Sequence, residues 1–162
     1  MVAVNIITST LVLIGILIFK FLYPKRPINL FILLILISIL PVISIFRQGA
    51  YESGDFNIHI YRAIAFYQSL TEGNLIPSWA GDLNASYGYP LFIFNYPLPY
   101  YFISFFHFLG FTFITSMKLF LSLTFILSGI FMYLFTKDLF KNKLAAFTSS
   151  IFYIFAPYHL ID

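Results

Sequence analysis

The chain contains no cysteine and few charged residues. The absence of cysteine excludes disulfides, thiolate catalysis and cysteine-based zinc sites. Charged side chains make up 9% of the 162 residues, whereas a soluble domain of this length carries roughly 25%. The net charge of +3 is too small and too dispersed for nucleic-acid binding. The sequence also lacks a phosphate-binding loop, a nucleophile-elbow motif and a dinucleotide-binding fingerprint.

Hydrophobic residues are correspondingly abundant, at 60% of the chain, and aromatic residues make up 22%. Long apolar runs are typical of helices that cross a bilayer, which takes about 20 residues. The sequence therefore predicts an all-α integral membrane protein, a single membrane domain over 1–162. Its four transmembrane helices are expected over residues 4–22, 28–46, 118–135 and 144–160. The shorter apolar stretch over 99–110 is expected to be re-entrant or interfacial.

The basic residues predict an orientation for these spans. The segments 20–26 and 137–143 carry three basic residues each. If 99–110 does not cross the membrane, both segments lie on the same side, which the positive-inside rule makes cytoplasmic. If 99–110 does cross, they lie on opposite sides. The first arrangement is favoured, and it predicts a multi-pass protein of the plasma membrane whose polar loop, 47–97, is extracytoplasmic.

The densest group of polar residues lies in that loop. Residues 55–70 have the apolar periodicity of an amphipathic helix, with Gly73 as its expected C-cap. Asp55, His59 and Arg62 are spaced i, i+4 and i+7, so they share one face of this helix. A carboxylate beside a membrane can act as a general base or bind a divalent cation, and a guanidinium suits a phosphate. The alternative is a capping residue followed by an ordinary solvated face.

Aromatic residues and prolines dominate the rest of the loop and the residues just after it, including Trp79, Tyr96 and Tyr100. One interpretation is an interfacial belt that anchors the chain at the membrane surface. The other is a groove that holds a lipid tail or a surface on which a sugar stacks. Asn84-Ala85-Ser86 is an N-glycosylation sequon. The three histidines have no i, i+4 pair, so the sequence gives no local support for a histidine metal site.

The order of these short motifs resembles a known family over about residues 28–162. The motifs are Gly54-Asp55-x-x-x-His59-x-x-Arg62, Gly73-Asn74-Leu75-Ile76-Pro77-x-Trp79, Gly88-Tyr89-Pro90-x-Phe92, Tyr96-Pro97-Leu98-Pro99-Tyr100-Tyr101 and Ala156-Pro157-Tyr158. The chain is similar in this order to the bacterial membrane proteins labelled 6-pyruvoyl-tetrahydropterin synthase-related. Those proteins in turn resemble the N-terminal part of the GT-C glycosyltransferases, which use polyprenyl-phosphate-linked sugars.

The resemblance implies a partial GT-C-like fold and a sugar transfer at the outer membrane face. Asp55 stands where those enzymes place an essential acid, which serves as base on the acceptor or holds a divalent metal, Mg²⁺ or Mn²⁺. Arg62 and His59 are then expected to contact the phosphate of the polyprenyl-phosphate sugar donor. Trp79, Tyr96 and Tyr100 are expected to hold membrane lipid or sugar.

The chain also departs from the GT-C pattern. Phe56 follows Asp55 where many GT-C enzymes have a second acid, and a further acid is usual in the next external loop. Whole GT-C enzymes have more spans, so the chain is expected to be an N-terminal fragment completed by C-terminal helices or a partner subunit. The alternative is a non-enzymatic lipid-binding, transport or accessory membrane protein.

Overall fold

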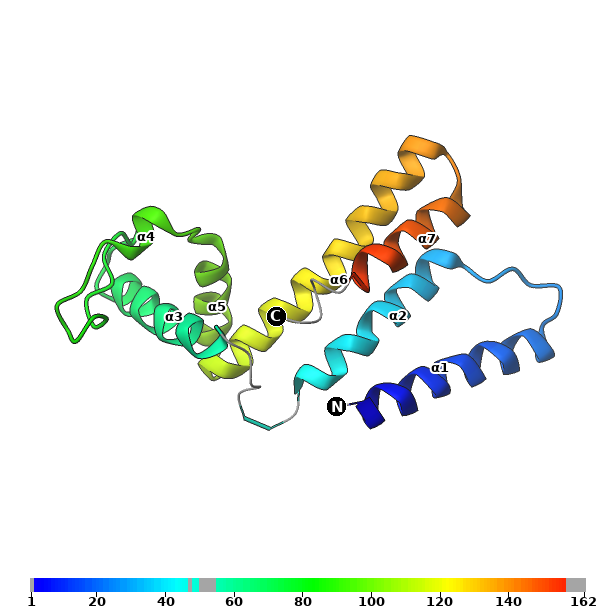
Figure 1. The fold of residues 1–162 in the computed structure, drawn as a ribbon, viewed down its shortest axis with the longest axis horizontal. Helices are drawn as coiled ribbons and strands as arrows, with labels where there is room; N and C mark the ends of the chain where they lie inside the picture. Colours follow the sequence, from blue (N-terminus) through cyan, green and yellow to red (C-terminus); the bar gives the residue numbers. More distant parts are fainter. Residues whose placement is uncertain (1, 47, 50–54, 157–162) are drawn as a thin grey trace. The chain divides into compact units, whose positions relative to one another are not determined.

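The computed structural model describes residues 2–46, 48–49 and 55–156, and the regular structure there is helical. Figure 1 shows the elements in chain order. They are α1 (Val2–Leu22), α2 (Leu30–Ile43), η1 (Ser44–Phe46), α3 (Phe56–Thr71), α4 (Leu91–Phe94), α5 (Leu98–Phe108), α6 (Phe113–Phe140) and α7 (Lys143–Ile154). The chain divides into two compact units. One comprises Met1–Arg47 with Ser122–Asp162, and the other comprises Gln48–Leu121.

The prediction of four transmembrane helices is wrong. Within the described residues, α6, with 28 residues, is the one helix long and apolar enough to cross a membrane. The helix α2 has 14 residues and α7 has 12, so they rise about 21 Å and about 18 Å. Both lengths fall short of the roughly 30 Å of a hydrocarbon core. Helix α1 has 21 residues, but only its part Thr10–Leu22 counts as an apolar helix, and that part is short of a span.

The cause of this error is that apolar runs in the sequence are longer than the helices they form. The run over 28–46 enters its helix only at Leu30, and after Ile43 the backbone tightens into the 3₁₀ turn η1. In the run over 144–160, helix α7 ends at Ile154, and residues 157–160 lie outside the described part of the chain. Composition therefore identified apolar segments correctly but overestimated the helical length of two of them.

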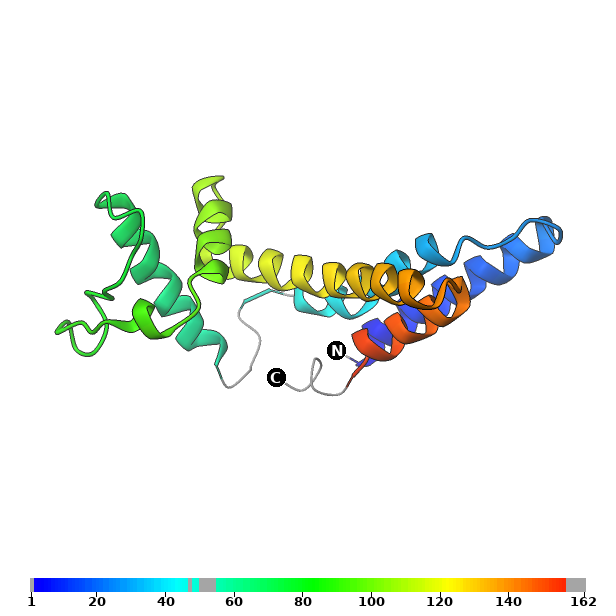
Figure 2. The same ribbon diagram turned by 90° about the horizontal axis from the view of Figure 1, so that it is seen from above.

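In the first unit, α2 packs against both α1 and α7, as Figures 1 and 2 show. The core there consists of Leu34, Tyr133, Ala146 and Ile154. Helices α6 and α7 approach closely at Gly129, which has no side chain. A Cβ at this position would crowd Ile154 of α7, since it would lie 3.0 Å from Cγ1. This use of small residues at helix contacts is common where side chains are nearly all apolar.

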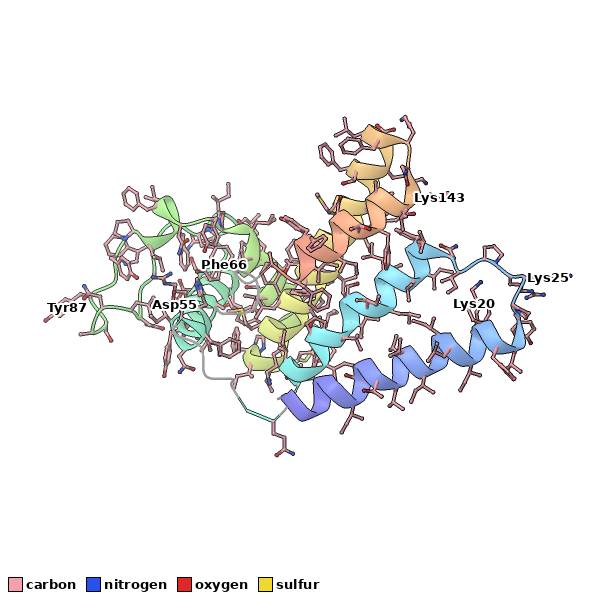
Figure 3. All side chains as sticks on the ribbon, turned by 45° about the vertical axis from the view of Figure 1, so that its right-hand side comes forward. Lys20, Lys25, Asp55, Phe66, Tyr87 and Lys143 are labelled. Atoms are coloured by element: carbon pink, nitrogen blue, oxygen red, sulfur yellow. The ribbon has the colours of Figure 1, made fainter. Side chains whose placement is uncertain are left out.

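In the second unit, α3 and α5 lie side by side and form the main helix pair. The helix predicted over 55–70 is confirmed as α3. Phe66 lies on the apolar face of α3 and is completely buried. Its ring meets those of Phe92 and Tyr101 edge-on, with ring centroids 4.9 Å and 4.8 Å away. Figure 3 shows Phe66 among the side chains between these helices. Edge-to-face aromatic pairs of this kind add to the stabilisation from buried area.

The end of α3 differs by one residue from the prediction. Glu72 occupies the C-cap position, and Gly73 follows it with φ of +94°. The Gly73 amide donates to the carbonyl of Leu70 at 3.1 Å. Glycine is suited to this place because a side chain at positive φ would be strained.

Candidate functional site

The first turns of α3 carry the polar side chains that the sequence singled out. Asp55 occupies the N-cap position, is exposed, and makes no side-chain capping hydrogen bond. One turn later, the half-buried His59 faces α5, and its Nδ1 lies 3.0 Å from the hydroxyl oxygen of Tyr100. The imidazole of His59 therefore points toward the interior of the unit, whereas the carboxylate of Asp55 is exposed.

Tyr100 is the most deeply buried member of this group, with 1% of its surface exposed. Its ring packs against Phe66 and Phe92, with centroids 5.7 Å and 5.6 Å away. Its hydroxyl also accepts a hydrogen bond from Nδ2 of Asn95 at 3.3 Å. The hydroxyl and Nδ1 of His59 share a hydrogen bond whose donor is set by the imidazole tautomer.

The electrostatics of the pair favour the neutral forms of both side chains. Burial lowers the pKa of His59, and the positive charge of Arg62 lowers it further, against an opposing effect of Asp55. Burial raises the pKa of Tyr100, although Arg62 and Asn95 oppose that rise. At neutral pH the site therefore presents a neutral imidazole, a protonated phenol and a guanidinium.

Arg62 lies in the wall of a pocket of about 590 Å³. The pocket is lined by residues of α3 and of the following loop: Ile58, Tyr61, Arg62, Leu83, Asn84 and Tyr89. Nε of Arg62 is buried and has no hydrogen-bond partner among the described residues. A buried donor without a partner is costly in a folded protein, so it marks a place where a ligand could bind.

The loop side of the pocket has an unusual backbone. Asn84, Ala85 and Ser86 all have positive φ, at 58°, 53° and 66°. A single antiparallel bridge closes the loop, with the Ala80 amide 3.0 Å from the carbonyl of Tyr89. Backbone in this region costs free energy in residues with a Cβ, so the surrounding structure must hold it. Figure 3 shows Tyr87 at the outer tip of this loop.

The structure brings together some of the predicted site residues and separates others. Asp55, His59, Arg62 and Tyr100 form one electrostatically linked group. Tyr96 affects the pKa of Tyr100 but is itself 64% exposed. Trp79 lies elsewhere, half-exposed beside Gly88, and does not line the Arg62 pocket.

The sequence interpretation missed the residues that complete the site. Asn95 donates to the Tyr100 hydroxyl, and the signal available in the sequence was its place as an amide between the aromatic residues Phe94 and Tyr96. Leu83, Asn84 and Tyr89 line the pocket. Asn84 was noticed only as part of a sequon, because no local pattern indicates which loop residues meet α3.

A divalent metal at Asp55 is not matched by the surroundings. The described residues contain no group of three or more His, Asp or Glu side chains that could hold a metal ion. Mg²⁺ and Mn²⁺ prefer several oxygen ligands. A single exposed carboxylate supplies too few of them to hold either ion. The described residues therefore do not fit a metal centre.

Comparison with known proteins finds a distant relative. The chain is 30% identical over 120 residues, or 74% of its length, to an uncharacterized protein of Lactococcus lactis subsp. cremoris (strain MG1363). The match covers 20% of that protein, so the chain spans about a fifth of the length of the relative. No family model matches the chain, and no solved structure matches it. The resemblance to the GT-C enzymes therefore stays a prediction.

Proposed function

We propose that the Gln48–Leu121 unit binds the phosphate of a polyprenyl-phosphate-linked sugar, at the outer face of the plasma membrane, as part of a glycosyltransferase. The observation that carries the proposal is the buried, unpartnered Nε of Arg62 in the wall of the pocket. A guanidinium presents its donors as a planar fork that matches two phosphate oxygens. A phosphate in the pocket would supply the missing acceptor and neutralise the positive charge.

The other walls of the pocket suit the remainder of such a donor. Ile58 and Tyr61, which are 45% and 63% exposed, stand beside Arg62 on α3, and Tyr89 faces them from the loop. Apolar and aromatic side chains with a few polar groups are typical of pockets for organic ligands. The aromatic faces would contact the sugar or the first isoprene units, while Asn84 offers an amide for a sugar hydroxyl.

Asp55 is proposed to be the base in the transfer. It precedes Arg62 by seven helical residues, about 10 Å along the axis, which leaves room for a sugar between them. The carboxylate would take the proton of the acceptor hydroxyl as its oxygen attacks the anomeric carbon. The bond from that carbon to the phosphate oxygen breaks, and the electron pair leaves with the polyprenyl phosphate. Arg62 would stabilise the charge on this leaving group.

Donor binding is the first test. The purified chain is titrated in detergent with a short-chain polyprenyl-phosphate sugar, and wild type is compared with Arg62→Gln and Arg62→Lys. Loss of a charge-assisted hydrogen-bonded pair costs about 1.5–3 kcal/mol, so Arg62→Gln should weaken binding by roughly 10- to 150-fold. Arg62→Lys should recover part of the affinity, because it keeps the charge and loses the fork. Arg26→Gln, in the other unit, is the control. A folded wild type that does not bind the donor would refute the proposal.

A second candidate is non-enzymatic binding of membrane lipid, and the exposed loop residues favour it. Leu75, Ile76 and Phe94 are 76%, 87% and 85% exposed, and large exposed apolar groups are typical of surfaces that contact a partner or a membrane. Asp55→Asn separates the two candidates. The enzyme hypothesis predicts unchanged donor binding with loss of sugar transfer, measured with labelled donor in native membranes. Lipid binding alone predicts that Asp55→Asn changes neither.

A further inference from the structure

The unit formed by Met1–Arg47 and Ser122–Asp162 has a basic pocket that the proposed function does not use. The pocket has a volume of about 710 Å³ and lies where the start of α2 meets the end of α6 and the start of α7. Its lining includes Asn29, Tyr133, Lys137 and Lys143. Figure 3 shows Lys143 at this end of the unit.

The two lysines of the pocket form no ion pair with a described residue, although Asp138 lines an adjoining pocket with them. Asp138 is the acidic residue nearest in sequence, and it forms an ion pair with Lys141 instead. The described residues give Lys137 and Lys143 no hydrogen bond or ion pair. The helix starts beside them are already capped by side chains, since Asn29 accepts from the Phe31 amide at 3.0 Å and Asn142 from the Leu144 amide at 2.8 Å. The positive charge of the lysines is therefore available to a ligand.

The charge balance of the unit points the same way. Its described basic residues all lie in or beside the two helix connections at this end, and they are Lys20, Lys25, Arg26, Lys137, Lys141 and Lys143. Against these six basic residues, the described part of the unit has one acidic residue, Asp138. An anionic partner fits this surface by charge, and a cationic one does not.

An apolar groove adjoins the basic pocket. It has a volume of about 470 Å³ and runs between α1 and α2, with Gly15, Ile16, Phe19 and Leu33 in its lining. The groove and the pocket share the residues Pro27, Ile28 and Asn29. A charged compartment and an apolar compartment that meet at a common wall match a ligand with an acidic head and a hydrocarbon tail.

We propose that this surface binds an anionic glycerophospholipid such as phosphatidylglycerol, with its phosphodiester between Lys137 and Lys143 and one acyl chain in the α1–α2 groove. Basic pockets at the ends of apolar helices are suited to acidic lipid head groups. The hydrocarbon chain would cover exposed apolar side chains, among them Ile32, which is 55% exposed, and Leu36, which is 48% exposed. This inference is independent of the sugar-donor site, because it concerns the other unit.

The test measures lipid selectivity. The purified chain is titrated with short-chain phosphatidylglycerol and with phosphatidylcholine of the same acyl length. A lysine near an anionic lipid contributes about fivefold to affinity, so the wild type should prefer phosphatidylglycerol by roughly tenfold or more. Lys137→Gln with Lys143→Gln should abolish the preference. Lys20→Gln with Lys25→Gln removes the same charge outside the pocket lining and should preserve most of it.

A groove variant tests the tail. A Cβ at Gly15 meets nothing within 4 Å, so Gly15→Phe can fill the groove and should weaken both lipids several-fold. Arg62→Gln should leave the lipid preference unchanged, which separates this proposal from the sugar-donor site. A wild type without preference, or one that binds glycerol phosphate as tightly as the lipid, would overturn the inference. Equal loss in the two lysine pairs would also overturn it, because it would mean that only net charge matters.

Discussion

Replacing Tyr100 by Phe tests the polar centre of the candidate site more directly than any other change. The substitution keeps the ring that packs between Phe66 and Phe92 and removes only the hydroxyl. That hydroxyl forms hydrogen bonds with His59 at 3.0 Å and with Asn95 at 3.3 Å. Both bonds would be lost, and both partner groups would stay in a partly buried place.

The magnitude follows from this geometry. A hydrogen bond contributes about 1 kcal/mol net, so two such bonds give about 2 kcal/mol. The ring adds nothing to the loss, because Phe fills the same volume. For a chain of this size the midpoint of thermal unfolding should fall by roughly 4–8 °C. The free energy of unfolding would be measured by urea titration in mild detergent, with helix content followed by circular dichroism.

A double-mutant cycle assigns the loss to the right pair. Tyr100→Phe combined with His59→Ala should destabilise by less than the sum of the single changes, with a coupling of about 1 kcal/mol. Tyr96→Phe is the matched control, because its side chain is 64% exposed and surface changes of this kind stay within about 0.5 kcal/mol. A loss equal to that of the control, or a cycle without coupling, would refute the proposed arrangement of the pair.

Three further changes probe the loop, a helix start and the pH response. Gly88→Ala should destabilise by about 1–3 kcal/mol in urea titration, because Gly88 has φ of +68° and its Cβ would collide with the indole of Trp79; a neutral result would contradict the described loop. Asn142→Ala should cost about 1 kcal/mol by removing the side-chain cap of α7, and Asn142→Asp should not; similar losses in both would argue against capping. Because the pKa of His59 is lowered by folding, the unfolded chain binds the proton first as pH falls below about 6.5, so stability declines from there toward the folded pKa. His59→Gln should flatten that decline, and an unchanged pH profile would show that another group causes it.

The elements with a strong periodic signal were predictable from the sequence. The apolar stripe of residues 55–70 predicted α3, because residues at spacings of three and four fall on one helix face and can be buried together. The same spacing placed His59 and Arg62 near one another, and the positive charge of Arg62 contributes to the lowered pKa of His59. Local patterns of this kind need no knowledge of the remaining chain.

The site as a whole was not predictable, because its other residues come from segments without a period. Tyr100 meets His59 because α5, which follows Pro97, packs against α3, and Asn95 then donates to the Tyr100 hydroxyl. Asn84 reaches the pocket through a loop with three consecutive residues at positive φ, none of them glycine. Backbone of that kind is disfavoured locally and is imposed by tertiary contacts, which a reading of neighbouring residues does not reveal.

The failure of the four-helix prediction has a consequence for interpreting the composition. The fraction of apolar residues in a sequence indicates how much apolar surface the chain has. It does not indicate how that surface is distributed among helices or how long those helices are. In this chain much of it stays on the outside of helices too short to cross a bilayer, such as Leu36 on α2 and Phe152 on α7, which are 48% and 75% exposed. Exposed apolar area on this scale favours contact with lipid or another apolar partner. The basic pocket at the ends of α2, α6 and α7 then decides which lipid, because charge is the feature that distinguishes one head group from another.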